Sequence, residues 1–339
     1  MAIHRRLLLA AAGATAARLA AAQASRSTEV TLTCGHVLPA AHPTHQRMLE
    51  MAAAIEQQTH GRVRLQVHPA GELGSDIEQL QKVRAGAMDL LSLSPLVLGS
   101  WLPSVQISGV AFAFGDVFGD YRGIWTAMDG RLGEWVRAQI ARTELFAFEK
   151  IWDNGYRHMT SRQRSITHPR DLRGFRMRVA VSPIFSSVFR GLDATPVPVN
   201  FTSVYSALQR GEVDGMENSL SLLHTAKIYE VQRFCALTSH MWDGFWMVGN
   251  QKNFARLPAD VQKVIRTVVN DTALVQRADT RKLNETVARK LVERGMLFTL
   301  TNQEEFRSSL RRAGYYAEWR AAFGEESWGL LEHATGKLA

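Results

Sequence analysis

The sequence is poor in cysteine and lacks the short motifs of several common enzyme classes. Two cysteines in 339 residues, Cys34 and Cys235, exclude a disulfide-rich scaffold and a four-cysteine zinc module. No dinucleotide-binding glycine fingerprint, phosphate-binding P-loop or G-x-S-x-G elbow is present. His42-Pro-Thr-His45 contains two histidines, but no third ligand is near. We therefore predict a solvated loop there, no metal site and no cofactor.

The composition leaves the class of partner open. Lys and Arg total 40 and Asp and Glu total 32, giving a formal charge of +8. Because this excess is spread along the chain, it does not demand nucleic acid, and we predict no nucleic-acid partner. The hydrophobic share of 46% and the charged share of 21% are typical of a soluble globular protein. At about 150 residues per domain, the length predicts two domains.

The first 24 residues are typical of a secretory signal. A basic start at His4-Arg5-Arg6 precedes an apolar run over 7–17, and Ala22-Gln23-Ala24 fits a cleavage site. The run is too short to span a bilayer, which needs about 20 residues. Arg5-Arg6 also hints at a twin-arginine signal, so export by the Sec or the Tat route stays open. In an oxidising compartment Cys34 and Cys235 are able to pair, but the sequence does not show whether they meet.

The pattern of apolar residues predicts an α/β fold in two units. In the first unit, strands are expected over 30–34, 63–67 and 89–93, and helices over 45–59 and 76–84. In the second, strands are expected over 145–151, 175–179, 213–218 and 238–248, an extended segment over 196–199, and helices over 183–190 and 201–209.

An amphipathic stripe follows from residue 259 to residue 294. These 36 residues would extend about 54 Å as a helix, which exceeds one small domain. The stripe therefore predicts either one helix, straight or kinked, that bridges two domains, or two helices. No flexible linker separates the units, so we expect the chain to cross between them. We predict domain I over 28–154 plus 244–283, domain II over 155–243 plus 284–339, and a ligand cleft between them.

Three polar residues lie at predicted strand ends of the second unit: Arg157, Arg178 and Asn218. In α/β sheets, ligands bind beyond the carboxyl ends of strands. The planar guanidinium of arginine grips a carboxylate with two charge-assisted hydrogen bonds, and an asparagine amide can add a third. The alternative is that both arginines belong to the solvated surface. Asp214 and Glu217 are either an acid pair or a turn acid beside a structural carboxylate.

The segments that contain these residues resemble the solute-binding proteins of tripartite ATP-independent periplasmic (TRAP) transporters. The resemblance covers nearly all of the chain after the signal, and its most specific part runs from Arg178 to Asn218. It is carried by Gly155-Tyr-Arg157-His-Met-Thr, Asp171 to Val179, Pro196-Val-Pro-Val-Asn-Phe201 and onward to Asn218, His36, Thr59 to Val63, and Pro69 to Gly74.

The resemblance implies two α/β domains that close like a clamshell on a small organic anion. It places the main carboxylate-binding arginine at Arg178, a second arginine at Arg157, the supporting amide at Asn218 and a pocket aromatic at Phe201. Trp242, Trp246, His36, Glu72 and Ser94 are expected near the hinge or cleft. Two departures are visible. A proline often seen within 109–114 is missing, and Ser94 stands where some sialic-acid binders have an acid, which disfavours that ligand.

The function implied is capture of a carboxylate in the periplasm and its delivery to a membrane permease driven by an ion gradient. The anion would dock on Arg178, and domain I would swing about hinges near Asn154 and Asp243. We expect no catalysis and a monomer. The alternatives are a periplasmic hydrolase or lyase, with Asp214 or Glu217 as its base, and a ligand sensor for a receptor.

Overall fold

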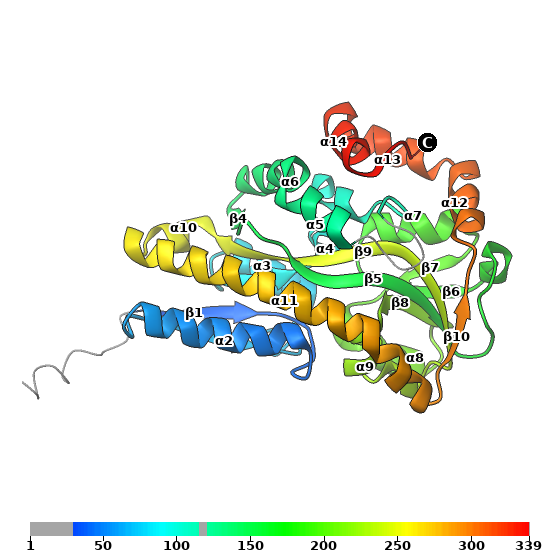
Figure 1. Cartoon of the computed structure of the whole chain (residues 1–339), viewed down its shortest axis with the longest axis horizontal. Coiled ribbons are helices and arrows are strands. Elements are labelled where there is room, and N and C mark those ends of the chain that lie inside the picture. The colour runs from blue at the N-terminus through cyan, green and yellow to red at the C-terminus, as the bar shows by residue number, and fades with distance from the viewer. Residues whose placement is uncertain (1–29, 115–120, 339) are drawn as a thin grey trace, which may run out of the picture.

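The structure is a computed structural model that describes residues 30–114 and 121–338. The predicted signal over 1–24 lies outside this part. The strands follow the order β2-β1-β3-β9-β5-β8-β6-β7, and β4 and β10 pair with β9. Helices flank the strands throughout (Figure 1). The predicted α/β class is thus confirmed.

Lobe 1 is built on β1, which lies in parallel between β2 and β3, and β3 and β4 run antiparallel to the end of β9. In β1 and β2 buried and exposed residues alternate, whereas β3 is buried throughout, as expected where both faces are covered. Its elements are β1 (Val30–Gly35), α2 (Pro43–Gln58), β2 (Val63–His68), α3 (Asp76–Arg84), β3 (Leu90–Leu93), α4 (Pro95–Leu98), η1 (Pro103–Gly109), α5 (Tyr121–Asp129), α6 (Arg131–Ala141), β4 (Leu145–Ala147) and α10 (Gln251–Ala255).

Lobe 2 is built on β8, which runs antiparallel to β5 and parallel to β6, with β7 at the far edge. Strand β10 pairs in parallel with the start of β9. The elements are β5 (Trp152–Ser161), η2 (Pro169–Leu172), β6 (Arg176–Val179), α7 (Pro183–Gly191), β7 (Thr195–Pro198), η3 (Phe201–Ser203), α8 (Val204–Gln209), β8 (Gly215–Ser219), α9 (Leu220–Thr225), η4 (Ile228–Glu230), β9 (Phe234–Asn250) and β10 (Leu297–Leu300).

Two long elements join the lobes. Strand β9 pairs with β5 through its first part and with β3 through its last part. Helix α11 (Ala259–Glu293) is one continuous helix that contacts α2 in lobe 1 and α9 in lobe 2, so the bridging helix is confirmed (Figure 1). Its buried Gln276 bonds both backbone groups of Asp153 at the start of β5, at 2.8 Å to the nitrogen and 2.6 Å to the oxygen.

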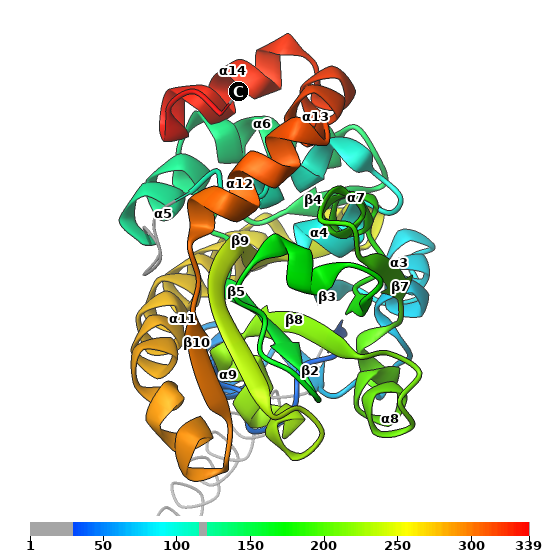
Figure 2. The same ribbon diagram turned by 90° about the vertical axis from the view of Figure 1, so that its right-hand side faces the viewer.

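The C-terminal helices α12 (Gln303–Arg312), α13 (Tyr315–Phe323) and α14 (Glu325–Thr335) lie at the opposite end of the molecule from α8 (Figure 2). Helix α12 contacts α7 of lobe 2, whereas α14 contacts α5, α6 and η1 of lobe 1. The C-terminal segment therefore packs on both lobes, and the boundaries predicted for the two domains stay a prediction.

Two local expectations were wrong. The strand predicted over 145–151 ends at Ala147, and a new strand begins at Trp152, so Arg157 lies inside β5 rather than at a strand end. His42 and His45 do not form a solvated loop: His42 is the N-cap of α2 and accepts the Thr44 backbone N–H, His45 lies in the first turn of that helix, and both are buried. Whether Cys34 and Cys235 pair was left open by the sequence, and both are buried free thiols in separate apolar clusters.

Candidate functional site

A small cavity lies between the lobes. Its volume is about 40 Å³, enough for a water molecule or two but far below the several hundred Å³ of ordinary ligand pockets. The lobes are therefore closed on each other in this structure. The lining residues are Val37, Leu38, Asp76, Ser94, Val97, Asn154, Arg157, Arg178, Ala180, Phe185, Phe201, Asn218, Leu222, Asp243 and Phe245.

Arg178 brings a buried positive charge into this cavity. Its strand β6 pairs with β7 on one side and β8 on the other, and the side chain is 1% exposed. The guanidinium donates from Nε and one terminal nitrogen to the carbonyl of Val199, with the Nε–O distance at 3.0 Å. Across residues 30–114 and 121–338, no carboxylate lies within 4 Å of it. Burial lowers the pKa of Arg178 to about 10, with Arg157 adding to the effect.

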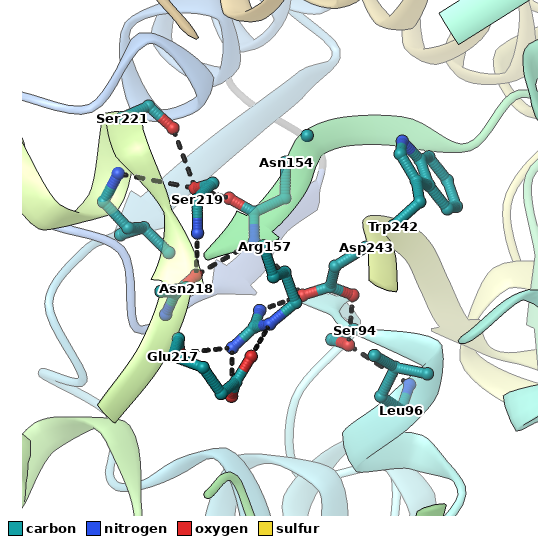
Figure 3. Close-up of polar contacts among 12 residues, drawn as sticks. Ser94, Leu96, Asn154, Arg157, Glu217, Asn218, Ser219, Ser221, Trp242 and Asp243 are labelled. Atoms are coloured by element: carbon teal, nitrogen blue, oxygen red, sulfur yellow. Dashed lines mark hydrogen bonds and ion pairs between the residues drawn. The ribbon is translucent and has the colours of Figure 1, made fainter. Parts of the chain in front are cut away.

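Arg157 is in the opposite situation, because two carboxylates neutralise it (Figure 3). Strand β5 lies between β8 and β9, which brings Glu217 and Asp243 to its two sides. One terminal nitrogen donates to Glu217 Oε1 at 2.9 Å, and the other donates to Asp243 Oδ2 at 2.7 Å. Nε also bonds Glu217. Four of the five N–H groups of Arg157 are thus held by the protein itself.

The pairing also decides whether the two proposed acids can act as a base. Burial would raise the pKa of Glu217, but the charge of Arg157 and the bond to His240 together lower it. Asp214 forms an ion pair with Arg176 at 2.6 Å on the surface and does not line the cavity. Neither acid is therefore placed as a general base beside an anion on Arg178.

Asn218 ends β8 and offers a donor to the cavity. Its Oδ1 accepts from the Ser219 backbone N–H at 2.9 Å, and Asn154 Nδ2 lies 3.4 Å away. Within the described chain, Asn218 Nδ2 makes no hydrogen bond. Ser94 is less available, because its hydroxyl caps α4 and donates to Asp243 Oδ1 at 2.6 Å (Figure 3).

Asp76 is a site residue that the sequence reasoning missed. It is the first residue of α3, and its side chain reaches the cavity from lobe 1, where it is 9% exposed. Its carboxylate accepts the backbone N–H of Phe201 in lobe 2. Burial raises the pKa of Asp76 to about 6, although the charge of Arg178 opposes the shift. The available signal was its position in a helix start directly after the turn that follows β2.

Four other residues that were expected at the hinge or cleft do not line the cavity. Trp242 is buried with its indole N–H donating to Asp153 at 2.9 Å, and Trp246 is buried within lobe 1. His36 is buried against His45, with the ring nitrogens 3.0 Å apart, and Glu72 is exposed. None of these four lines the cavity. The apolar wall is formed instead by Phe201, which was expected, and by residues that were not: Phe185, Leu222 and Phe245.

A second contact joins the lobes away from the cavity. Gln106 of η1 accepts at Oε1 from the Ser182 hydroxyl at 2.8 Å and from the Ile184 backbone N–H at 3.2 Å. Ser182 precedes α7 but does not cap it. Gln106 therefore supplies from lobe 1 the cap that the first turn of α7 lacks.

The chain forms two lobes joined by β9 and α11, with the buried Arg178 at the cavity between them, which is the arrangement of a two-lobed binding protein. The model of the bacterial extracellular solute-binding protein family 7, named DctP, matches residues 34–318, and the chain belongs to this family.

The relatives agree with this assignment. The chain is 32% identical over 271 residues to an uncharacterised protein of Sinorhizobium fredii, covering 77% of this chain and about half, 48%, of that protein. It is 28% identical to the C4-dicarboxylate-binding periplasmic protein DctP of Rhodobacter capsulatus, with 86% of each chain covered. The sugar acid binding protein of Advenella mimigardefordensis in complex with galactonate has 26% identity and a TM-score of 0.85, with 92% of this chain and 99% of that chain covered. A two-lobed binding-protein fold is thereby confirmed.

None of the helices in the described ranges is both long and apolar enough to cross a bilayer. The same residues contain no cluster of three or more potential metal ligands.

Proposed function

We propose that this chain is exported by its N-terminal signal, captures a small organic anion in the periplasm and delivers it to a TRAP-type membrane permease. The observation that carries the proposal is the buried guanidinium of Arg178, which has no carboxylate partner in the described chain. A buried charge is costly unless it is paired, so this arrangement favours an anionic ligand. That relatives are named for a C4-dicarboxylate and for a sugar acid supports the same chemistry.

Each expected contact receives a role in this proposal. Arg178 grips the carboxylate, and Asn218 Nδ2 donates a further bond to it. Phe201 packs against the ligand, its ring centre lying 5.9 Å from the Arg178 guanidinium. Arg157 acts as a positioning residue, because its charge is already neutralised. Ser94 holds Asp243 rather than the ligand.

Closure follows from contacts at the predicted hinge. The pairing of β5 with β9 shifts register between Asp153 and Gly155, opposite Asp243. Such an irregularity lets a strand bend without breaking its ladder. We propose that lobe 1 opens about this point, admits the anion and closes again. The protein acts as a monomer and without a cofactor.

The first test is a thermal-shift screen of the full chain without its signal against a library of organic acids. A ligand that binds only the folded state raises the melting temperature. The matched variants are Arg178→Lys and Arg176→Lys, on the same strand. Arg178→Lys should abolish the shift, since a point charge cannot replace the planar fork. Arg176→Lys should retain it, because Arg176 is exposed and paired with Asp214.

Unchanged affinity in Arg178→Lys would contradict the role of Arg178. Turnover of the bound acid, seen by mass spectrometry, would instead favour the enzyme alternative. Uptake that persists in a strain without the permease would contradict the delivery step.

A further inference from the structure

The polar groups of the cavity discriminate between classes of organic acid. We propose that the ligand is a small monocarboxylate with one hydrogen-bond donor near the carboxylate and an otherwise apolar body, as in a short 2-hydroxy acid. C4-dicarboxylates and polyhydroxylated acids are excluded. This inference rests on the function proposed above and narrows its substrate class.

The first argument is the charge count. Arg157 is neutralised by two bonded carboxylates, Glu217 and Asp243, whereas Arg178 and the third acid, Asp76, form no ion pair within 4 Å in the described chain. One carboxylate on Arg178 therefore meets the single unpaired cation among the lining residues. A second carboxylate on the same ligand would have no cation to pair with, because Arg157 is already neutralised and the remaining charged lining residue, Asp76, is itself an acid. Burying an unpaired charge of this kind is strongly unfavourable.

The second argument is the supply of hydrogen-bond partners. Asn154, Ser94 and Asp243 bond one another or Arg157, so they have little capacity left for a ligand. What remains is one donor, Asn218 Nδ2, and one acceptor, the Asp76 carboxyl. This carboxyl receives the backbone N–H groups of Phe201 and of Asp76 itself, and its two oxygens can accept further bonds. The Asp76 carboxyl, which the nearby charge of Arg178 influences, suits a hydroxyl next to the carboxylate.

The third argument is the apolar wall. Eight of the 15 lining residues are apolar: Val37, Leu38, Val97, Ala180, Phe185, Phe201, Leu222 and Phe245. A hydroxyl that faces such a wall loses its bonds to water and gains none in return. A sugar acid carries several hydroxyls of this kind, whereas an alkyl body is stabilised by the same contact.

The test uses four C4 acids that differ by one feature at a time, with dissociation constants from isothermal titration calorimetry. 2-Hydroxybutanoate should bind most tightly. Malate, which adds a second carboxylate, should bind at least about 30-fold more weakly. Erythronate, with two more hydroxyls, and butanoate, without the hydroxyl, should each bind about tenfold more weakly.

An isosteric variant isolates the charge argument. Asp243→Asn removes one of the two charges that neutralise Arg157 and leaves an oxygen for its N–H groups. The ratio of malate to 2-hydroxybutanoate affinity should therefore rise about tenfold or more in this variant. An unchanged ratio would refute the charge count even if the wild-type ranking holds.

Two kinds of failure are distinguishable. Tighter binding of malate or erythronate than of 2-hydroxybutanoate would overturn the inference, and so would a dicarboxylate or polyhydroxylated acid as the tightest ligand of the whole library. The capture function would survive both results if Arg178→Lys abolished that binding. If no organic acid in the library binds the wild-type chain, the proposed function itself fails. A larger apolar monocarboxylate as the tightest ligand would support the inference.

Discussion

Replacing each cavity arginine by methionine should change the stability of the unliganded protein in opposite ways. The pKa of Arg178 falls to about 10, well below the ordinary range of an arginine, chiefly because burial desolvates the charge. At 1.36 kcal/mol per pKa unit, holding that charge costs the folded state about 3 kcal/mol. Arg178→Met removes this cost but leaves the Val199 carbonyl without its donor, which offsets about 1–3 kcal/mol. The melting temperature should therefore stay the same or rise by a few degrees.

Arg157→Met should be strongly destabilising. It leaves Glu217 and Asp243 buried, close together and without their cation. Breaking a buried ion pair from one side costs about 3–5 kcal/mol. At roughly 2–4 °C for each kcal/mol, the melting temperature should fall by on the order of 10 °C.

Both variants are measured by circular dichroism melts without ligand and by calorimetry with the best ligand of the screen. Arg176→Met is the matched control, since this exposed arginine on the same strand should shift the melting temperature by only a degree or two. Arg178→Met should lose at least about 30-fold in affinity while keeping its fold. If Arg178→Met instead melts as early as Arg157→Met, the cation at Arg178 is already compensated inside the protein, and the reasoning from an unpaired charge is wrong.

Three further predictions concern closure and pH. The ligand carboxylate should raise the pKa of Asp76 above its value of about 6, so binding takes up a proton. The affinity measured by calorimetry should therefore fall by up to about tenfold per pH unit from pH 6 to pH 8. An Asp76→Asn variant should show no such dependence on pH. Gln106→Leu removes the acceptor of the Ile184 backbone N–H, a loss that affects the closed form only. The affinity should therefore fall about tenfold although residue 106 lies outside the cavity. An unchanged dissociation constant would contradict this prediction. Gly155→Ala puts a Cβ 2.3 Å from Asn284 Nδ2 at a φ of +99°, so it should lower the melting temperature by several degrees, whereas a neutral effect would show that β5 tolerates strain at the proposed hinge.

Much of the fold was predictable because its elements follow local rules. The helix over 76–84 was predicted with its observed bounds, and in the structure Ser75 and Glu78 form a capping box at its start. The strands β1, β2 and β3 and the long helix α11 were predicted to within about two residues from apolar periodicity alone. Strand β5 was missed because all ten of its residues are buried, charged ones included, so no alternation marks it.

The site was only partly predictable, because its polar residues depend on pairing between distant strands. The sequence indicates arginines at 157 and 178 but not which of them has a partner. That difference arises because β5 lies between β8 and β9, each of which contributes a carboxylate, whereas β6 lies between β7 and β8 and meets a carbonyl. Asp76 was missed for a similar reason. An acid in the first turn of a helix is ordinary, and only the approach of lobe 2 buries it.

The positions of the three side chains proposed to bind the ligand explain how binding drives closure. Arg178 and Asn218 belong to lobe 2, whereas Asp76 enters the cavity from lobe 1. A ligand whose carboxylate rests on Arg178 and whose hydroxyl reaches Asp76 bonds both lobes at once. The ligand therefore binds the closed form more tightly than the open form by the free energy of its contact with Asp76, because its contact with Arg178 is available in both forms. An acid without that hydroxyl should bind the open form with the same affinity as the hydroxy acid, but it should close the lobes less completely. Small-angle scattering of the two complexes would resolve this difference.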